Sequence, residues 1–216
     1  ESVFIAGGDG EYSIRWFTPT KELALVGHAT LAAAHVVLSV LEPDRSEVQF
    51  TSPISGQLAA YRDEANVAIV LPADDPVTCE PPAALIQGLG RTPASTLKGR
   101  HYVAVFDDPE EVAALEPKFD VLETLDLPTI AVTARGHESD YVLRFFAPAN
   151  GVPEDPVSGV AQCSLMPYWA SKLARAELTS RQLSPKGGEM NCKMLDEGVQ
   201  IAGPCCMIFS GVLENC

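Results

Sequence analysis

Short runs of β-branched and aromatic residues, separated by turn residues, dominate the hydrophobic pattern of this chain. Such runs predict short strands bounded by turns. A glycine-rich stretch at residues 7–10 predicts a hairpin turn, because glycine adopts positive φ angles without strain. The predicted strands are residues 2–6, 47–51, 56–61, 67–71, 101–106, 141–146, 189–194 and 199–202.

Stretches rich in alanine and leucine predict the two main helices. The first spans residues 29–41 and ends at the proline that follows it. The second spans residues 161–173, where Pro167 is expected to kink or restart the helix. Two shorter helices are expected at 83–90 and at 109–115.

An internal repeat organises these elements. The octapeptide that begins at Tyr12 (YSIRWFTP) returns at Tyr141 (YVLRFFAP), an offset of 129 (141 − 12), and after an insertion the offset becomes 132. Each copy runs strand, turn, strand, polar loop, glycine, helix and two further strands. The repeat predicts an α+β fold of two pseudo-repeated domains, residues 1–75 and 76–216, with the boundary in a segment rich in proline and acidic residues.

The second copy is preceded by the strand at 101–106 and the helix at 109–115, which have no counterpart before Glu1. We therefore expect the first domain, as it stands in this sequence, to lack its opening strand and helix.

The charge of the chain narrows the classes of function. Twenty-nine acidic residues oppose 15 basic ones in a chain of 216 residues, which gives a formal charge of −14. This charge disfavours binding to nucleic acid or to an anionic membrane surface and favours a small-molecule function. The longest uncharged run, residues 23–41, contains two histidines and predicts a buried helix rather than a membrane span.

The cysteines predict a cytoplasmic protein with reduced thiols, because they form neither a CxxC pair nor a zinc-ligand spacing with histidine. They are Cys79, Cys163, Cys192, Cys205, Cys206 and Cys216.

Glycines at the two predicted helix starts are candidate binding elements. They lie in the sequences that begin at Gly27 (GHAT) and Gly159 (GVAQ). Free amides at a helix start and the helix dipole attract a carboxylate, such as that of a substrate. The same glycines are equally consistent with a purely structural role, in which they let a strand and a helix pack closely.

Acidic residues lie five positions before each of these glycines, at Glu22 and Glu154, and Asp155 follows the second. Acid–base chemistry on carbon needs two such groups with pKa values set apart by their surroundings. Any one of them is more often a solvated or helix-capping residue. His28, inside the first glycine loop, is as consistent with catalysis as with a structural role. Nucleotide, phosphate, serine-hydrolase and metal-ligand motifs are absent from the sequence, so chemistry without a metal or cofactor is expected.

The ordered motifs resemble those of the PhzF-like phenazine-biosynthesis family, within the diaminopimelate-epimerase fold, over nearly the whole chain. The motifs begin at Arg15 (RWFTP), Gly27 (GHATL), Glu154 (EDPVSG) and Lys186 (KGGE). The resemblance implies two domains, each a small, mainly antiparallel sheet wrapped around a central helix, with the active site between them. It also implies a homodimer and cofactor-independent proton transfer on a small carboxylated metabolite.

Matched residue by residue, the resemblance implies that Glu1 and Asp155 transfer protons and that His28 assists them. It implies that Glu22 orders the loop before the first helix, and we expect Glu22 to do so by bonding free amides. The substrate-binding positions expected on the two loops are Gly27, Ala29, Thr30, Ser158, Gly159 and Val160.

The chain departs from the family pattern at Val160 and Gln162, where the family carries a serine and a histidine. A cofactor-independent isomerase is the expected function, and a catalytically silent binding or scaffold protein is the alternative. A cysteine-dependent racemase is disfavoured, because Val26 and Ser158 occupy the positions at which those racemases carry cysteine.

Overall fold

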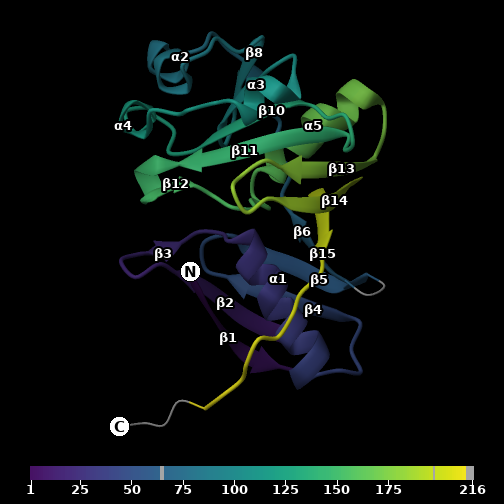
Figure 1. Cartoon of the computed structure of the whole chain (residues 1–216). Coiled ribbons are helices and arrows are strands. Elements are labelled where there is room, and N and C mark those ends of the chain that lie inside the picture. Colours follow the sequence, from purple (N-terminus) through teal and green to yellow (C-terminus); the bar gives the residue numbers. More distant parts are fainter. Residues whose placement is uncertain (64–65, 197, 213–216) are drawn as a thin grey trace. The chain divides into compact units, whose positions relative to one another are not determined.

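A computed structural model describes residues 1–63, 66–196 and 198–212 of the chain (Figure 1). Contacts group the residues into two compact units: unit 1 comprises Glu1–Ile69 and Ala202–Cys216, and unit 2 comprises Val70–Ile201. Each unit mixes helices with strands. The sequence-based boundary between residues 75 and 76 stays a prediction, as does an active site between domains.

Unit 1 is a curved sheet with one long helix. Its strand order is β1-β2-β4-β5-β6, and β3 pairs with β2. Neighbouring strands are antiparallel except for β2 and β4, which are parallel. The strands are β1 (Ser2–Gly8), β2 (Glu11–Phe17), β3 (Glu22–Leu23), β4 (Glu47–Ser52), β5 (Gly56–Asp63) and β6 (Asn66–Leu71), in which the chain leaves unit 1.

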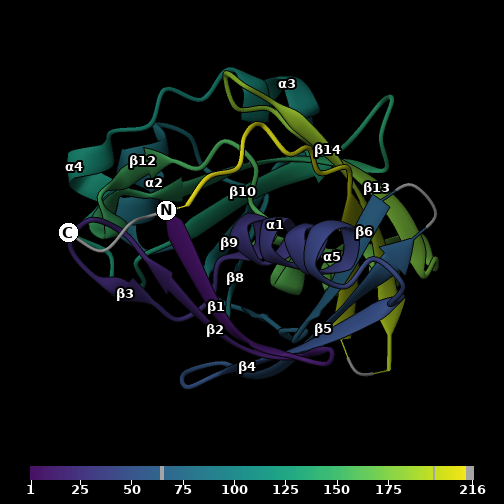
Figure 2. The same ribbon diagram turned by 90° about the horizontal axis from the view of Figure 1, so that it is seen from below.

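The helix of unit 1, α1 (Gly27–Val36), continues into a π-helical turn, Val37–Leu41. It begins two residues before the expected start and ends, as expected, before the proline at position 43. The helix packs against β1 and β5 inside the curve of the sheet (Figure 2). The apolar side chains of this core come from the inward faces of the strands and from the helix, and include Ile14, Trp16, Val48, Phe50, Leu58, Ala33, Ala34, Val37 and Leu38.

Unit 2 contains a larger sheet in the order β15-β14-β13-β11-β10-β9-β8-β7, with β12 paired to β11. The pairs β9–β10 and β11–β13 are parallel, and the other pairs recorded in unit 2 are antiparallel. The strands are β7 (Val77–Thr78), β8 (Ser95–Lys98), β9 (Tyr102–Val105), β10 (Ile130–Arg135), β11 (Tyr141–Ala147), β12 (Val152–Glu154), β13 (Glu177–Gln182), β14 (Gly188–Leu195) and β15 (Gly198–Gly203).

The helices of unit 2 are α2 (Ala83–Leu89), α3 (Pro109–Ala113), α4 (Phe119–Leu122) and α5 (Gln162–Leu173), with a 3-10 turn at Pro148–Asn150. The helix expected at 83–90 forms as α2 and ends at Gly90, which adopts φ +71°. Across the described part of the chain, no helix is both long enough and apolar enough to span a membrane.

Helices cover both faces of the central strand β10. Ile130, Val132 and Ala134 face a cluster that includes Leu85, Val112 and Leu122 from α2, α3 and α4. Thr133, which points to the opposite face because side chains alternate along a strand, accepts a hydrogen bond from Trp169 Nε1 of α5. Burial on both faces explains why β10 is mostly apolar before its exposed last residue, Arg135.

The hairpins that precede α1 and α5 have matching registers. Phe17 pairs with Glu22 in the β2–β3 hairpin, and Phe146 pairs with Glu154 in the β11–β12 hairpin. The sequence repeat makes these positions equivalent. Each hairpin therefore delivers an acidic residue to the same place, five residues before the glycine that opens the helix region.

Pro167 lies inside α5, and the helix continues without a break from Gln162 to Leu173. Of the two expected effects of Pro167, a restart of the helix is therefore wrong, and a kink stays a prediction. Proline lacks the amide that would bond the carbonyl four residues earlier, that of Cys163, and the amide of Asp74 donates to this carbonyl instead, at 2.8 Å. A neighbouring segment thus completes the hydrogen bonding of the helix.

The carboxylate of Asp74 adds two further contacts beside the same helix. Its Oδ2 accepts hydrogen bonds from Ser164 Oγ at 2.8 Å and from the Arg100 amide at 2.7 Å. Gly99 permits this approach, because a Cβ there would lie 2.4 Å from Asp74 Oδ2. Asp74 therefore ties α5 to the loop before β9.

We predict that Asp74→Ala lowers the free energy of unfolding by about 1–3 kcal/mol, because the Ser164 hydroxyl and the Arg100 amide lose their acceptor. Urea denaturation measures the change. Asp75→Ala is the matched control, because Asp75 is an exposed neighbour, and it is expected to have little effect. Equal effects of the two variants would contradict this role of Asp74.

Candidate active site

Each hairpin that leads to a main helix carries an arginine–glutamate ion pair. Arg15 donates through Nε and Nη2 to Glu22 at 2.8 and 2.7 Å, and Arg144 donates in the same way to Glu154 at 2.7 and 2.9 Å. The expectation that Glu22 bonds free amides is wrong: its carboxylate binds Arg15, which lowers the pKa of Glu22. Glu22 therefore lacks the environment of a general acid, since its ion pair favours the charged form.

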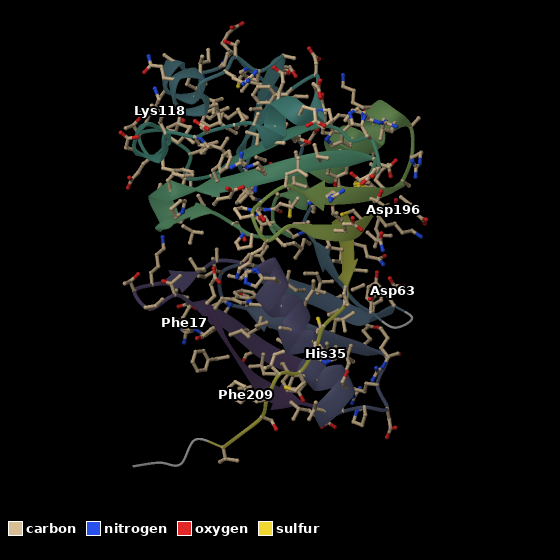
Figure 3. The ribbon with its side chains drawn as sticks, in the orientation of Figure 1. Phe17, His35, Asp63, Lys118, Asp196 and Phe209 are labelled. Carbon is tan, nitrogen blue, oxygen red and sulfur yellow. The ribbon has the colours of Figure 1, made fainter. Side chains whose placement is uncertain are left out.

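A phenylalanine completes each of these clusters. The Arg15 guanidinium lies 5.0 Å from the ring centroid of Phe17, and that of Arg144 lies 5.1 Å from Phe146. Figure 3 shows Phe17 projecting from the end of β2. Cation–π contact and bidentate pairing hold each arginine in one orientation.

The two ion pairs differ in how far their side chains are buried. The side chains of Arg15 and Glu22 are 53% and 27% exposed, whereas those of Arg144 and Glu154 are 10% and 14% exposed. Arg144 Nη1 also donates to the carbonyl of Leu115 at 2.7 Å. The pair in unit 2 is therefore a nearly enclosed anchor, and the pair in unit 1 is open to solvent.

We predict that Glu154→Gln lowers the free energy of unfolding by about 3 kcal/mol, because it leaves the nearly buried Arg144 charge without its partner. Glu22→Gln is the matched change in unit 1 and should have a much smaller effect, since solvent and salt screen an exposed pair. Thermal or urea unfolding of both variants measures the difference. Similar losses in the two variants would contradict the contrast drawn from burial.

Two of the three expected catalytic residues come together in unit 1. His28 Nε2, on the first turn of α1, lies 3.4 Å from Glu1 Oε2 at the start of the chain. Both side chains remain accessible, at 50% and 30% exposure. The amides of Gly27, His28 and Ala29, at the start of α1, have no intrahelical partner, whereas that of Thr30 donates to the Val26 carbonyl. This end of the helix therefore combines a carboxylate, an imidazole and free backbone donors.

Other expected binding residues at this helix start are buried. Gly27 and Ala29 are buried, and Thr30 is fully enclosed with its hydroxyl donating to the Val26 carbonyl at 2.8 Å. The Thr30 hydroxyl thus serves the helix itself. Substrate contacts of Gly27, Ala29 and Thr30 stay predictions.

Asp155 lies in unit 2, directly after β12, and its backbone is fixed on both sides. Its amide donates to the Phe145 carbonyl at 2.9 Å, and its carbonyl accepts from Gln182 Nε2 at 2.5 Å. The side chain is partly exposed. The third expected catalytic residue therefore occupies a rigid backbone position.

The loop from Ser158 to α5 presents the glycine start of the second helix. Ser158 is buried, and its amide donates to Gln182 Oε1 at 2.7 Å. Gly159 and Val160 are partly exposed, and their carbonyls accept from the amides of Gln162 and Cys163 in a tight first turn. The amides that open α5 are therefore bonded within this turn, and the Ala161 amide donates to Ser158 Oγ at 3.4 Å. The amides of Gly159 and Val160 precede them. Roles of Ser158, Gly159 and Val160 in substrate binding stay predictions.

His101, the first residue of the strand expected at 101–106, directly precedes β9 and is only 3% exposed. Its Nε2 lies 3.4 Å from the Val160 carbonyl and its Nδ1 lies 2.5 Å from Thr129 Oγ1. Burial lowers the pKa of His101 to about 4, although the Val160 carbonyl and Asp74 oppose this shift; Arg100 also lowers it. A neutral imidazole therefore links the β9 segment to the carbonyl of Val160.

This pKa predicts a pH dependence of stability. In the unfolded chain His101 takes up a proton near its ordinary pKa of about 6.5, whereas the folded protein resists protonation down to about pH 4. The unfolded state therefore binds more protons between these values, and acidification from pH 6.5 to pH 4 should cost the wild type up to about 3 kcal/mol more than His101→Gln. Urea unfolding of both proteins across this range measures the difference. Parallel curves would contradict the buried neutral state of His101.

Position 162, where the chain departs from the family pattern, lies in the interior of unit 2. Gln162 is fully buried, and its Oε1 accepts a hydrogen bond from the Tyr141 hydroxyl. Tyr141 stacks on Trp169 of α5, with ring centroids 5.8 Å apart. Gln162 therefore has a structural partner in this chain.

Cysteine-based chemistry has little support among the described thiols. The five described cysteines are all free, and Cys216 lies outside the described residues. Burial raises the pKa of Cys163 to about 11 and that of Cys192 to about 12, which disfavours the reactive thiolate. No group of three or more metal-ligating side chains gathers within residues 1–63, 66–196 and 198–212, and the expectation of chemistry without a metal or cofactor stays a prediction.

Comparison with known families agrees with the motifs. The family model for phenazine biosynthesis-like proteins (PhzC-PhzF) matches residues 1–211. The chain belongs to the PhzF-like family. Relatives of this PhzF-like protein include two uncharacterized isomerases of Pseudomonas aeruginosa. One is 41% identical over 99% of this chain and 82% of the relative, and the other is 42% identical over 98% and 81%.

Solved structures agree with this assignment. A PhzF-family phenazine biosynthesis protein of Enterococcus faecalis matches with a TM-score of 0.88 at 35% identity, over 94% of this chain and 78% of that chain. A PhzC/PhzF protein of Clostridium difficile matches with a TM-score of 0.89 at 32% identity, over 99% and 82%. A hydroxyproline epimerase of Agrobacterium vitis matches with a TM-score of 0.55 at 10% identity, over 93% and 69%, and this likeness shows the fold alone.

Gln182 is the residue of this site that the sequence analysis missed. It lies at the end of β13, is 1% exposed, and touches the backbone of both Asp155 and Ser158. The β13 strand buries Leu178, Ser180 and Gln182 on one face. Only one of these three side chains is apolar, so the hydrophobic pattern carries little signal for the strand.

Proposed function

We propose that this PhzF-like protein is an isomerase that moves a proton on a small carboxylated metabolite without a cofactor. Glu1 and Asp155 are the proton-transfer groups, and His28 assists them. The observation that carries the proposal is the contact of Glu1 with His28, 3.4 Å apart at the first turn of α1. Isomerase names among the relatives support the same class of reaction.

The proposed reaction uses one carboxylate as a base and the other carboxyl group as an acid. The base removes a proton from a carbon of the substrate, and the acid delivers a proton to the same or a conjugated carbon, so the substrate gains and loses no atoms overall. His28 steers the proton held by Glu1 or stabilises the charge that develops. Glu154 is not assigned to this role, because Arg144 occupies its carboxylate.

The proposed binding positions for a substrate carboxylate are the backbone amides that open α1 and those of Gly159 and Val160, which precede α5. Helix starts offer free N–H groups and a favourable dipole for an anion. Gly27, Ala29 and Thr30 would frame one of these positions, and Ser158, Gly159 and Val160 the other. Fixed backbone donors need no reorganisation when negative charge grows on the substrate during proton transfer.

The proposal also includes the arrangement of the chain in two pseudo-repeated units. Equivalent hairpin registers and equivalent arginine–glutamate–phenylalanine clusters support two pseudo-repeated units, each an α+β sheet around a central helix. A homodimer, a cytoplasmic location, and the absence of nucleic-acid and membrane partners are the assembly and setting that we propose from the sequence.

Deuterium wash-in from D2O tests the proposal. The panel consists of small carboxylic acids with a C–H beside the carboxylate or beside a conjugated double bond, and it includes L-proline and trans-4-hydroxy-L-proline. We predict wash-in by the wild type for at least one member, and a loss of about 100-fold or more in Asp155→Asn and in Glu1→Gln. Asp155→Asn should change the free energy of unfolding by less than about 1 kcal/mol.

Glu22→Gln is the matched control for these variants, because Glu22 is the acid that the repeat alone would pair with Glu154. It should retain wash-in. Full activity of Asp155→Asn would remove Asp155 from the mechanism, and loss of activity in Glu22→Gln with full activity in Glu1→Gln would transfer the acid role to Glu22.

A catalytically silent binding protein is the second candidate, favoured by the valine at position 160 in place of the family's serine. In that case the wild type would show no wash-in, and the double change Val160→Ser with Gln162→His would create it. Wash-in by the wild type would exclude this candidate.

A further inference from the structure

Gln182 holds both ends of the loop that carries Asp155. Its Oε1 accepts the Ser158 amide at 2.7 Å, and its Nε2 donates to the Asp155 carbonyl at 2.5 Å. These two contacts use one acceptor lone pair and one donor of the same planar amide group. The separation of residues 155 and 158 is therefore set by the geometry of one side chain.

The position of this side chain is itself fixed. Gln182 is 1% exposed and ends β13, where it pairs with Gly188 of β14. The parallel pairing of Gln182 with Leu143 places the same residue beside β11. Because β13 is hydrogen-bonded on both sides, Gln182 reaches the loop from a rigid strand and not from a mobile segment.

Neighbouring contacts anchor the parts of the loop that Gln182 does not touch. The Asp155 amide donates to Phe145 at 2.9 Å, and Ser184 Oγ donates to the Pro156 carbonyl at 2.6 Å. A Cβ at Gly188 would lie 2.5 Å from Val157 Cγ2, so glycine leaves room there for the loop. Gln182 is the side chain that ties the aspartate to the start of the helix region.

We propose that Gln182 is a positioning residue, which sets the placement of Asp155 relative to the amides that precede α5. The inference rests on the proposed function, because it assigns Gln182 to the proton-transfer step of that reaction. A glutamine suits this place because it supplies a donor and an acceptor without a charge, whereas an apolar side chain would leave a buried amide and a carbonyl without partners.

The first arm of the test measures the loop directly. Amide hydrogen exchange by NMR should show that the Ser158 amide exchanges at least about 10-fold faster in Gln182→Met than in the wild type, because its acceptor is gone. The Asp155 amide, bonded to Phe145, should change much less. Ser184→Ala is the local control, because it removes the contact to Pro156 and leaves both Gln182 contacts in place, and it should leave Ser158 protected.

The second arm measures turnover with the panel compound that shows wash-in by the wild type. Gln182→Met should lower kcat for wash-in by about 10-fold or more with a smaller change in KM, because the aspartate is misplaced while the binding amides remain. Leu178→Ala is the control for general destabilisation, since Leu178 is a buried residue on the same face of β13. It should lower the thermal midpoint and leave kcat unchanged at a temperature at which it is folded.

The outcomes separate the two proposals. The positioning role of Gln182 is overturned if the Ser158 amide stays protected in Gln182→Met. It is also overturned if the Ser158 amide exchanges faster while kcat is unchanged. The proposed function stands in both cases. Equal kcat losses in Gln182→Met and Leu178→Ala also overturn it, because they indicate a merely structural role. If the wild type shows no wash-in, the proposed function and the positioning role fail together, and the amide exchange then decides only whether Gln182 holds the loop.

If Gln182→Met does not fold, the same two measurements are made on Gln182→Glu, which keeps an acceptor for the Ser158 amide. A protected Ser158 amide with a lowered kcat supports the positioning role. Full kcat in Gln182→Glu overturns it.

Discussion

A bidentate arginine–glutamate pair across a short hairpin is the interaction on which the rest of the site depends. In unit 2 it joins Arg144 of β11 to Glu154 of β12, the residue directly before Asp155. The pair is nearly enclosed, so its geometry is held in one arrangement. The pair fixes the direction in which the backbone continues after Glu154. It therefore also fixes where the segment from Asp155 to the start of α5 begins. Unit 1 has the same pair, Arg15 with Glu22, before α1.

Buried polar side chains hold the loop that follows Glu154 in one conformation. Strand β13 supplies Gln182, the β13–β14 turn supplies Ser184, and the segment before β9 supplies His101. Each satisfies a backbone group that would otherwise be costly to bury. The amides of Gly159 and Val160, which precede α5, take no part in these contacts, and we propose them as the donors that an anion can use. The functional proposal therefore follows from which backbone groups the interior satisfies and which it leaves free.

Sequence reasoning reached the parts of the fold that carry a periodic or glycine signal. The strands at 56–61 and 141–146 and the helices at 29–41 and 83–90 form at or within a few residues of their expected places. The fate of Pro167 could not be predicted, because the amide that replaces its missing donor belongs to Asp74, 93 positions away (167 − 74). The Glu22 carboxylate was misjudged for a related reason. Its partner Arg15 lies across a hairpin whose register no local pattern specifies.

The residues of the candidate site likewise differ in whether the sequence predicts them. The resemblance to the family supplied Glu1 and His28, and the structure places them in contact in unit 1. Gln182 and His101 carried no sequence signal, since a buried polar residue in a strand resembles a surface residue when only its letter is known. Their importance appears only when their hydrogen-bond partners are known, and these include backbone groups, which a sequence does not distinguish.

The central proposal is that a carboxylate binds the backbone amides that open α1, beside Glu1 and His28, and those of Gly159 and Val160, which follow Asp155. The most direct measurement is a titration of the ¹⁵N–¹H NMR spectrum with benzoate, and with benzamide as the neutral control. The account predicts saturable downfield movement of the amide protons of His28 and Val160 with benzoate and none with benzamide. Movement of equal size with both compounds, or no movement of these two amides with benzoate, would contradict it.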